Sequence, residues 1–332
     1  MTALVARLHR WLGERMATRA ARILATLAIL ISLALVTWPL LNTAFSLQAQ
    51  RAGILKSLEK CSAKDRDPAA MQLMQRGTVT VGDREYGVLI VAMMLISWRR
   101  WLQSKRTESK FSPSFPTFLF VFVCLQGAFG AWTVTMKLQP IIVTIHLLLG
   151  MALLALLAWY GSRQSTQPNI QTSAPSLRTP TVLATVLLAI QIGLGGWVST
   201  NYAALACTDF PLCGGVFLPP MDFANGFTIW RDLGMTANGE YLPFDALTAI
   251  HWTHRTFAFI VFAIVSWVAI VAMRTASLHR TARWLLILMG LQLMVGIATI
   301  FLQLPLLLAV MHNGIAALLL LLLIILNQKL KH

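Results

Sequence analysis

The sequence predicts an all-α integral membrane protein, with eight transmembrane helices arranged as two pseudo-repeated four-helix bundles. Hydrophobic residues make up 57% of the 332 residues and charged residues only 12%, about half the charged share of an ordinary soluble domain. The apolar residues gather in runs of about 20, the length of helix that crosses a bilayer. A pattern of Gln, Gly and His recurs in the two halves of the chain. This composition excludes a disordered chain and a simple soluble enzyme.

Seven apolar runs are long enough to span a bilayer as helices: residues 23–45, 115–135, 141–160, 181–200, 248–273, 284–303 and 306–326. An eighth run, residues 86–101, is shorter, and counting it inverts the direction of every later helix. With eight helices and the N-terminus inside, 17 Lys and Arg residues lie on the inner side and nine on the outer side. Positive residues concentrate on the cytoplasmic side, so this bias favours eight helices with both termini in the cytoplasm. The net charge of +15 therefore indicates topology rather than a nucleic acid partner.

A polar, proline-containing linker divides the predicted helices into two halves. It covers residues 161–180, between an N-terminal half at 1–160 and a C-terminal half at 181–332. The first apolar run is longer than the 7–15 residues typical of a signal peptide core, so we expect a retained membrane anchor. The two long loops, residues 48–85 and 201–247, both fall on the outer side of this topology.

The two halves share an internal repeat that ends on a histidine. In both copies a Gly follows a Gln by four residues and a His follows it by 20. The repeated residues are Gln126, Gly130 and His146 in the first half and Gln292, Gly296 and His312 in the second. A third copy of the Gln and Gly positions occurs in residues 191–197, which parallel residues 126–132.

Three histidines are candidates for function because a histidine inside a membrane is costly without a partner. His146, His254 and His312 all lie four to seven residues past a predicted outer boundary, and hence at a common depth. Neutral imidazoles at one depth on facing helices are suited to axial ligation of a heme iron, and His254 and His312 could pair in this way. Arg255 could then meet a heme propionate. The alternative is that each histidine only forms hydrogen bonds between helices. His251 is expected to lie near the interface and to bond locally.

The second long loop contains two cysteines that can form a disulfide. Cys207 and Cys213 are separated by five residues in a proline-containing segment that faces an oxidising compartment in the predicted topology. Closing so short a ring stabilises the fold by roughly 2–3 kcal/mol. A redox role is the alternative, although the pair is not a Cys-x-x-Cys motif.

The chain resembles heme A synthase, a family of the cytochrome oxidase assembly proteins, over residues 115–326. The segments that carry the resemblance are 195–202 (GGWVSTNY), 206–213 (ACTDFPLC), 221–227 (MDFANGF), 249–255 (AIHWTHR), 132–135 with 143–146 (WTVT and VTIH), and 305 with 310–313 (P and VMHN). The resemblance covers about two-thirds of the chain. It implies a bacterial inner membrane protein with two pseudo-repeated four-helix halves.

The resemblance also implies an activity and a set of ligands. Members of the family oxidise a methyl group of heme O to the formyl group of heme A by successive hydroxylation, for terminal oxidase biogenesis. It implies that His254 and His312 ligate heme b, that the substrate porphyrin lies near His146, and that Cys207 and Cys213 are the family's cysteine pair. The implied partners are heme O, heme O synthase, membrane lipid and an electron donor that the sequence does not identify. Nucleic acid is excluded, and a homo-oligomer is permitted.

Residues 1–114 depart from the family pattern. The first loop contains only Cys61, and no histidine occurs between His9 and His146. Glu85 takes the family's acidic position and is, with His146, a candidate catalytic residue, whereas Val88 stands where a histidine is expected. His146 would therefore act without its counterpart. The alternative is a non-catalytic heme b-binding protein that aids oxidase assembly. A plain transporter is disfavoured because the spans lack the acidic residues that couple ions.

Overall fold

The structure is a computed structural model that describes residues 83–103, 113–164 and 175–330. Every regular element of this described part is helical. Its long helices are α3 (Asp83–Gln103), α4 (Ser114–Thr135), α5 (Pro140–Gln164), α6 (Arg178–Thr200), α8 (Phe244–Met273), α9 (Ala276–Phe301) and α10 (Leu306–Lys329). Three short helical turns lie between them: η2 (Pro175–Leu177), η3 (Ala203–Leu205) and α7 (Phe223–Gly226).

Six of the described helices are long and apolar enough to cross a membrane, namely α4, α5, α6, α8, α9 and α10. Large apolar side chains also lie on the outward surfaces of these helices. An apolar outer surface is suited to contact with lipid rather than with water. Examples on α8 and α9 are Phe259, Trp267, Ile270, Trp284 and Ile287. The protein is therefore a multi-pass membrane protein, and these six helices of the described part are its candidate spans.

The two remaining predicted spans have different outcomes. The 86–101 run forms a helix, α3, but α3 is not one of the six candidate spans. Charged residues at both of its ends shorten its apolar stretch. The 23–45 run lies outside the described residues, as does the first long loop up to residue 82, so the count of eight stays a prediction.

The chain divides into two compact units, residues 30–121 in one and residues 1–29 with 122–332 in the other. In the first unit, α3 packs on the start of α4, where the indole N–H of Trp98 donates to the Thr117 hydroxyl at 3.1 Å. Trp98 also meets Trp101 edge to face, with ring centroids 5.5 Å apart.

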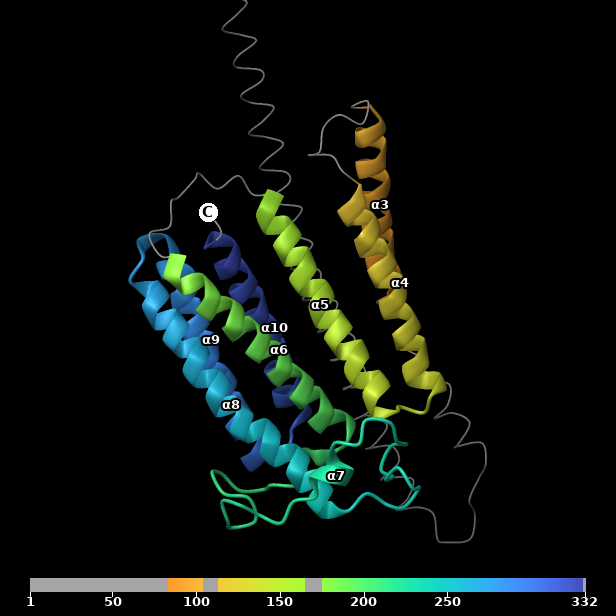
Figure 1. The fold of residues 1–332 in the computed structure, drawn as a ribbon, viewed down its shortest axis with the longest axis vertical. Coiled ribbons are helices and arrows are strands. Elements are labelled where there is room, and N and C mark those ends of the chain that lie inside the picture. The colour runs from red at the N-terminus through yellow and green to blue at the C-terminus, as the bar shows by residue number, and fades with distance from the viewer. Residues whose placement is uncertain (1–82, 104–112, 165–174, 331–332) are drawn as a thin grey trace, which may run out of the picture. The chain divides into compact units, whose positions relative to one another are not determined.

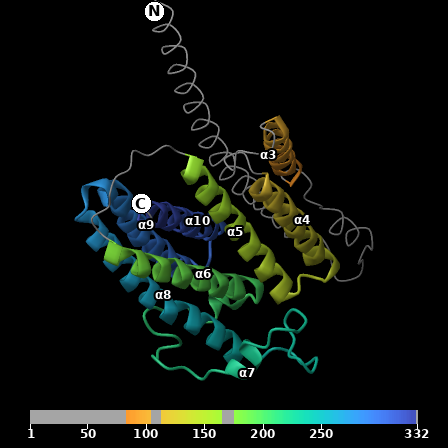
Figure 2. The same ribbon diagram turned by 45° about the horizontal axis from the view of Figure 1, so that its top comes forward.

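The second unit is built on α6, α8, α9 and α10, which pack on one another around a continuous apolar core, while α5 covers α6 and α10 (Figures 1 and 2). The core where these helices meet is built largely from buried aliphatic side chains, as at Val265, Ala269, Leu285, Leu319 and Leu323. Polar side chains also join these helices: the Asn327 amide donates to the Thr185 hydroxyl at 2.8 Å and ties α10 to α6.

Small residues let α5 and α6 approach closely. A methyl group added at Gly196 would lie 2.9 Å from Cδ2 of Leu147 of α5, so a larger residue there would require the end of this side chain to move. One turn further, the hydroxyls of Thr144 and Thr200 lie 3.2 Å apart in a hydrogen bond between the helices. Close packing and hydroxyl bonds of this kind hold membrane helices together where no hydrophobic effect does.

The turns that join α4 to α5 and α9 to α10 have the same backbone geometry. Each contains two consecutive non-glycine residues with positive φ, Lys137 and Leu138 in one and Gln303 and Leu304 in the other. The second of each pair donates its N–H to a carbonyl five residues back at 2.8 Å. The internal repeat seen in the sequence therefore extends to the local structure of these two helix pairs.

Candidate functional site

Each of the three candidate histidines lies against a Gln and a Gly of the neighbouring helix. The Gln and Gly are four residues apart, so they lie about one helical turn from each other on the same face. The three sets are Gln126 and Gly130 of α4 with His146 of α5, Gln191 and Gly195 of α6 with His254 of α8, and Gln292 and Gly296 of α9 with His312 of α10. We call each set a histidine seat.

The glycine of each seat makes room for the imidazole. A Cβ built on Gly130, Gly195 or Gly296 would lie 3.1 Å from Cε1 of its histidine in all three cases. The two nitrogens of His254 would then lie 3.7 and 3.8 Å from the added carbon, and those of His146 at 3.6 and 3.8 Å. The three rings therefore rest on their glycines with the same edge.

In the first seat, Gln126 and His146 form a reciprocal pair. The Gln126 side-chain amide donates to the backbone carbonyl of His146 at 3.0 Å. The His146 Nδ1 lies 3.2 Å from the backbone carbonyl of Gln126, and since a carbonyl only accepts, Nδ1 carries the proton. Nε2 of His146 is then the unprotonated nitrogen, which is the one that can bind a metal.

In the other two seats the Gln side chain reaches the imidazole itself. The Gln191 amide nitrogen donates to the His254 backbone carbonyl at 3.1 Å and lies 3.1 Å from Nδ1 and 3.4 Å from Nε2 of the same ring. The Gln292 amide nitrogen lies 3.1 Å from Nε2 of His312.

The donor set of the second half fits a heme with two axial imidazoles. Nδ1 of His312 is buried and has no hydrogen-bond partner among the described residues, and Nη1 of Arg255 is in the same condition. Since the Gln292 amide nitrogen can only donate, Nε2 of His312 carries the lone pair that an iron could take in place of this hydrogen bond. A buried guanidinium N–H without an acceptor suits a carboxylate. A porphyrin supplies four of the six iron ligands itself, so two imidazoles complete the set.

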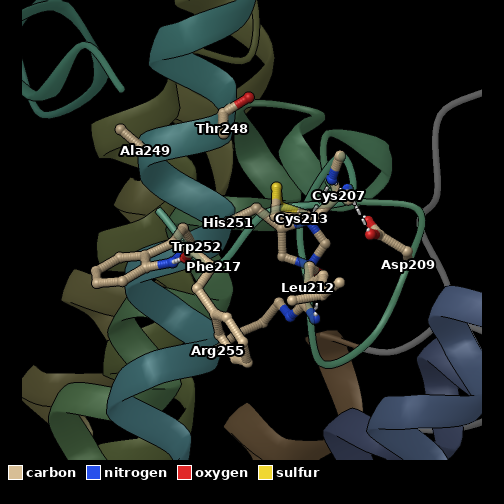
Figure 3. The surroundings of a disulfide bond; sticks show 12 residues. Cys207, Asp209, Leu212, Cys213, Phe217, Thr248, Ala249, His251, Trp252 and Arg255 are labelled. Atoms are coloured by element: carbon tan, nitrogen blue, oxygen red, sulfur yellow. Dashed lines mark hydrogen bonds between the residues drawn. A yellow bond between two sulfur atoms is a disulfide. The ribbon is translucent and has the colours of Figure 1, made fainter. Parts of the chain in front are cut away.

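The loop between α6 and α8 carries the disulfide predicted from the sequence. Cys207 and Cys213 are bonded and both are buried. The chain then turns through Gly214 and Gly215, whose φ values of 64° and 78° favour glycine. Both of their N–H groups donate to the Asp209 carboxylate at 2.8 Å, so the residues after the disulfide are bonded to a residue within the disulfide ring (Figure 3).

These hydrogen bonds set the protonation of Asp209. The N–H of Gly215 is the largest influence and lowers the pKa of this carboxyl, desolvation is the second and opposes it, and the N–H of Gly214 and the charge of Arg255 lower the pKa further. Each of these groups stabilises the ionised carboxylate.

Three residues of α8 hold the disulfide loop against the start of the helix (Figure 3). The N–H of Cys207 donates to Nδ1 of His251 at 3.3 Å. The indole N–H of Trp252 donates to the Phe217 carbonyl at 2.9 Å. Nη2 of Arg255 donates to the Leu212 carbonyl at 3.0 Å. The loop therefore covers the turn of α8 that carries His254.

One expectation changes in the light of these contacts, and another is narrowed to a single nitrogen atom. His251 bonds to a residue 44 positions away rather than locally, because the loop folds back onto α8. Arg255 holds the loop with one amino group and lies 5.3 Å from the Phe210 ring. A propionate contact for Arg255 stays a prediction, and Nη1 is the group left for it.

A buried arginine fixes the other part of the loop. Arg231 donates to the Asn201 side-chain carbonyl at 2.5 Å and to the Met235 carbonyl at 3.2 Å, and its guanidinium lies 5.8 Å from the Trp197 ring centre. Burial lowers the pKa of this guanidinium. Trp197 in turn donates to the Gly226 carbonyl at 2.9 Å, so the loop is attached to the end of α6 as well as to α8.

Two candidates from the divergent N-terminal third fall in α3. Glu85 lies in the first turn of this helix and Val88 in its second. Cys61 lies outside the described residues. Sequence reasoning missed the roles of His251 and Trp252 in holding the loop, because their partners are carbonyl and N–H groups that no side-chain pattern reveals.

Residues 83–324 match the COX15-CtaA family of cytochrome oxidase assembly proteins. The chain belongs to this family. The COX15-CtaA match begins at the first residue of α3, so it includes Glu85 and Val88 and extends further than the motifs alone suggested.

Several proteins similar to this chain carry the name heme A synthase. The protein of Shewanella oneidensis is 39% identical over 221 residues, which cover 65% of this chain and 66% of the relative. That of Methylobacterium radiotolerans is 30% identical and covers 58% of this chain and 52% of its own length. That of Mesorhizobium japonicum is 30% identical and covers 70% and 62%. The chain thus matches between about half and just under two thirds of these relatives.

Proposed function

We propose that the chain is a heme A synthase-type membrane oxidoreductase, which converts a methyl group of heme O to the formyl group of heme A for terminal oxidase biogenesis. The single observation that carries the proposal is the triple histidine seat, found in a member of the COX15-CtaA family. The three imidazoles pack against their glycines in the same way. Two of them would ligate a resident heme and the third would ligate a porphyrin substrate.

The second half would hold heme b. His254 and His312 supply the axial nitrogens, and Gly195 and Gly296 leave the space in which the two rings lie. A bound heme b supplies one-electron redox chemistry to the site. Arg255 would hold a propionate through Nη1 while Nη2 keeps the disulfide loop in place.

The first half would bind heme O. Nδ1 of His146 carries the proton and donates it to the Gln126 carbonyl, so Nε2 is unprotonated. This nitrogen would bind the iron of the substrate. The substrate methyl is hydroxylated twice, each step removing two electrons from the carbon, and the resulting hydrate loses water to give the formyl group. Glu85 is the acidic residue proposed to assist. Each hydroxylation also requires an oxidant that takes up the two electrons and a source of the oxygen atom, and both come from outside the chain, together with any electron donor.

The setting proposed for this reaction is the bacterial inner membrane. Both termini would lie in the cytoplasm, and the disulfide loop would lie on the outer face with heme O synthase as a partner. The buried, bonded cysteines support an oxidising location for the loop.

The experiment is pigment analysis of the full chain co-expressed with a source of heme O. The purified protein should carry heme b, and the extract should contain heme A by reversed-phase chromatography. The matched control is His146→Ala, which should keep heme b and lose heme A. A folded, heme b-loaded protein that yields no heme A would contradict the enzyme and support the non-catalytic assembly protein, while a folded protein without any heme would contradict both.

A further inference from the structure

The disulfide loop carries an exposed apolar tip. Val216, Phe217 and Leu218 are consecutive large apolar residues, and 48%, 71% and 72% of their surfaces are exposed. No charged residue occurs between Cys213 and Asp222. A contiguous apolar surface of this kind indicates a contact with lipid or with another protein. We call residues 216–218 the loop tip.

The backbone of the loop tip is fixed by the surrounding structure. The N–H of Cys213 donates to the Val216 carbonyl at 2.9 Å, and the N–H of Val216 donates back to the Cys213 carbonyl at 3.4 Å. The indole N–H of Trp252 holds the next carbonyl, that of Phe217, at 2.9 Å. The disulfide to Cys207 joins this turn to the rest of the loop. The exposure of the apolar side chains is therefore imposed by the fold.

The same loop reaches the lipid-facing surface of α8. The ring of Phe210 stacks on that of Phe259 with centroids 6.2 Å apart, and Phe259 is one of the outward apolar side chains of this span. Phe259 lies five residues beyond His254, which contacts Gly195 five residues before the end of α6 at Thr200. Along the helix axis Phe259 is therefore about 15 Å past the end of α6. The loop descends beside the helices, because its Phe210 ring contacts a residue at this depth.

The length of α8 places these contacts at the edge of the hydrocarbon layer. The helix has 30 residues, about 45 Å of rise, whereas the hydrocarbon layer is about 30 Å thick. The charged Arg274 follows its last residue, and the roughly 20 residues that cross the layer, counted back from this arginine, reach His254. His251, Trp252 and Arg255 lie at this boundary, and Figure 3 shows the loop residues that they bind beside these turns of α8.

We propose that the loop tip inserts into the leaflet on its own side of the membrane, with Phe217 and Leu218 at the boundary between lipid headgroups and acyl chains. Uncharged aromatic and aliphatic side chains favour this boundary. The exposed carboxylates of the loop, Asp232 and Glu240, belong to a different part of it, beyond α7. The partner of the tip is therefore lipid, which anchors the loop over the turn of α8 that carries His254. This inference goes beyond the proposed function and holds with or without a bound heme.

The test measures which collision reagents reach a nitroxide label on the tip of the full chain in phosphatidylcholine nanodiscs. The label is attached to Leu218→Cys in a background that carries Cys61→Ser and Cys124→Ser. Molecular oxygen concentrates among acyl chains, whereas a nickel chelate stays in water. Two labelled positions serve as matched controls: Ile260→Cys, an exposed apolar position within α8, and Asn238→Cys, an exposed polar position of the same loop.

The ratio of oxygen to nickel accessibility at Leu218→Cys should be several-fold above that at Asn238→Cys and should approach that at Ile260→Cys. Phe217→Cys should behave in the same way. A ratio equal to that at Asn238→Cys places the tip in water and overturns the proposal. Low accessibility to both reagents shows that a protein surface covers the tip, and it overturns the proposal as well.

A label-free measurement covers the case in which a cysteine variant does not fold. Hydroxyl radicals generated in water should oxidise Phe217 of the unsubstituted chain in nanodiscs several-fold more slowly than Tyr241, which is 85% exposed in the same loop. Each rate is divided by the rate of the same residue in the denatured chain. Equal protection of Phe217 and Tyr241 contradicts insertion of the tip.

Discussion

The glycines of the histidine seats permit a sharp test of the ligand geometry. In Gly296→Ala the new methyl carbon would lie 3.1 Å from Cε1 of His312, a few tenths of an ångström closer than ordinary van der Waals contact. The ring must move by that amount, and overpacking of this kind costs about 1–3 kcal/mol. Since 1.4 kcal/mol is a factor of ten in affinity, heme b retention should fall by roughly five- to 150-fold. Gly195→Ala should do the same through His254.

The assay is the amount of low-spin heme b that remains on the purified protein after dialysis against a heme scavenger. Gly290→Ala is the matched control, because it lies on the same helix and a Cβ there meets nothing within 4 Å. Both alanines gain about 1 kcal/mol of helix propensity, so propensity cancels in the comparison. If Gly296→Ala and Gly195→Ala retain as much heme b as Gly290→Ala, the imidazoles are not held in these seats as ligands and the reasoning fails.

The other predictions concern the ligands and the loop. His254→Ala or His312→Ala should abolish the low-spin heme b spectrum, whereas His146→Ala should spare it; loss of that spectrum from His146→Ala alone would refute the division between the halves. Cys207→Ser opens the disulfide ring and should lower the free energy of unfolding by about 2 kcal/mol from loop-closure entropy, measured by denaturant unfolding beside a reduced wild-type sample; equal stability of the oxidised and reduced wild type would contradict this value. Asp209 has a lowered pKa in the folded state, so its stabilisation of the loop is full above the unfolded pKa of about 3.9 and is lost as the pH falls through the folded value. The loop of the wild type should therefore become sensitive to pepsin only as the pH falls below about 4, and Asp209→Asn should remove this pH dependence; a variant that keeps the wild-type profile would exclude this carboxylate as its cause.

The helices were predictable because helix formation in a membrane depends on the local sequence. The predicted run at 181–200 is α6 at Arg178–Thr200, and the run at 306–326 is α10 at Leu306–Lys329. The shorter run at 86–101 was harder to judge, since α3 begins and ends on charged residues and its apolar stretch is too brief for hydropathy to decide.

The candidate site was predictable in its residues but not in its pairings. The spacing of Gln, Gly and His pointed to His146 and His312, and these two pairs are joined by short turns that bring α4 to α5 and α9 to α10. The third seat joins Gln191 to His254 across 63 residues and a long loop. No periodicity fixes such a contact, because the packing of α6 on α8 decides it.

The sequence by itself determined that the chain lies in a membrane, where six of its helices run, which histidines could serve as ligands and that Cys207 and Cys213 could bond. These properties follow from hydropathy and from spacing along one chain segment. Only the tertiary structure decided that each imidazole rests on a glycine of the next helix, and that His251, Trp252 and Arg255 hold the disulfide loop. The physical reason is that these contacts join atoms far apart in sequence, and their hydrogen bonds use backbone groups that every residue possesses.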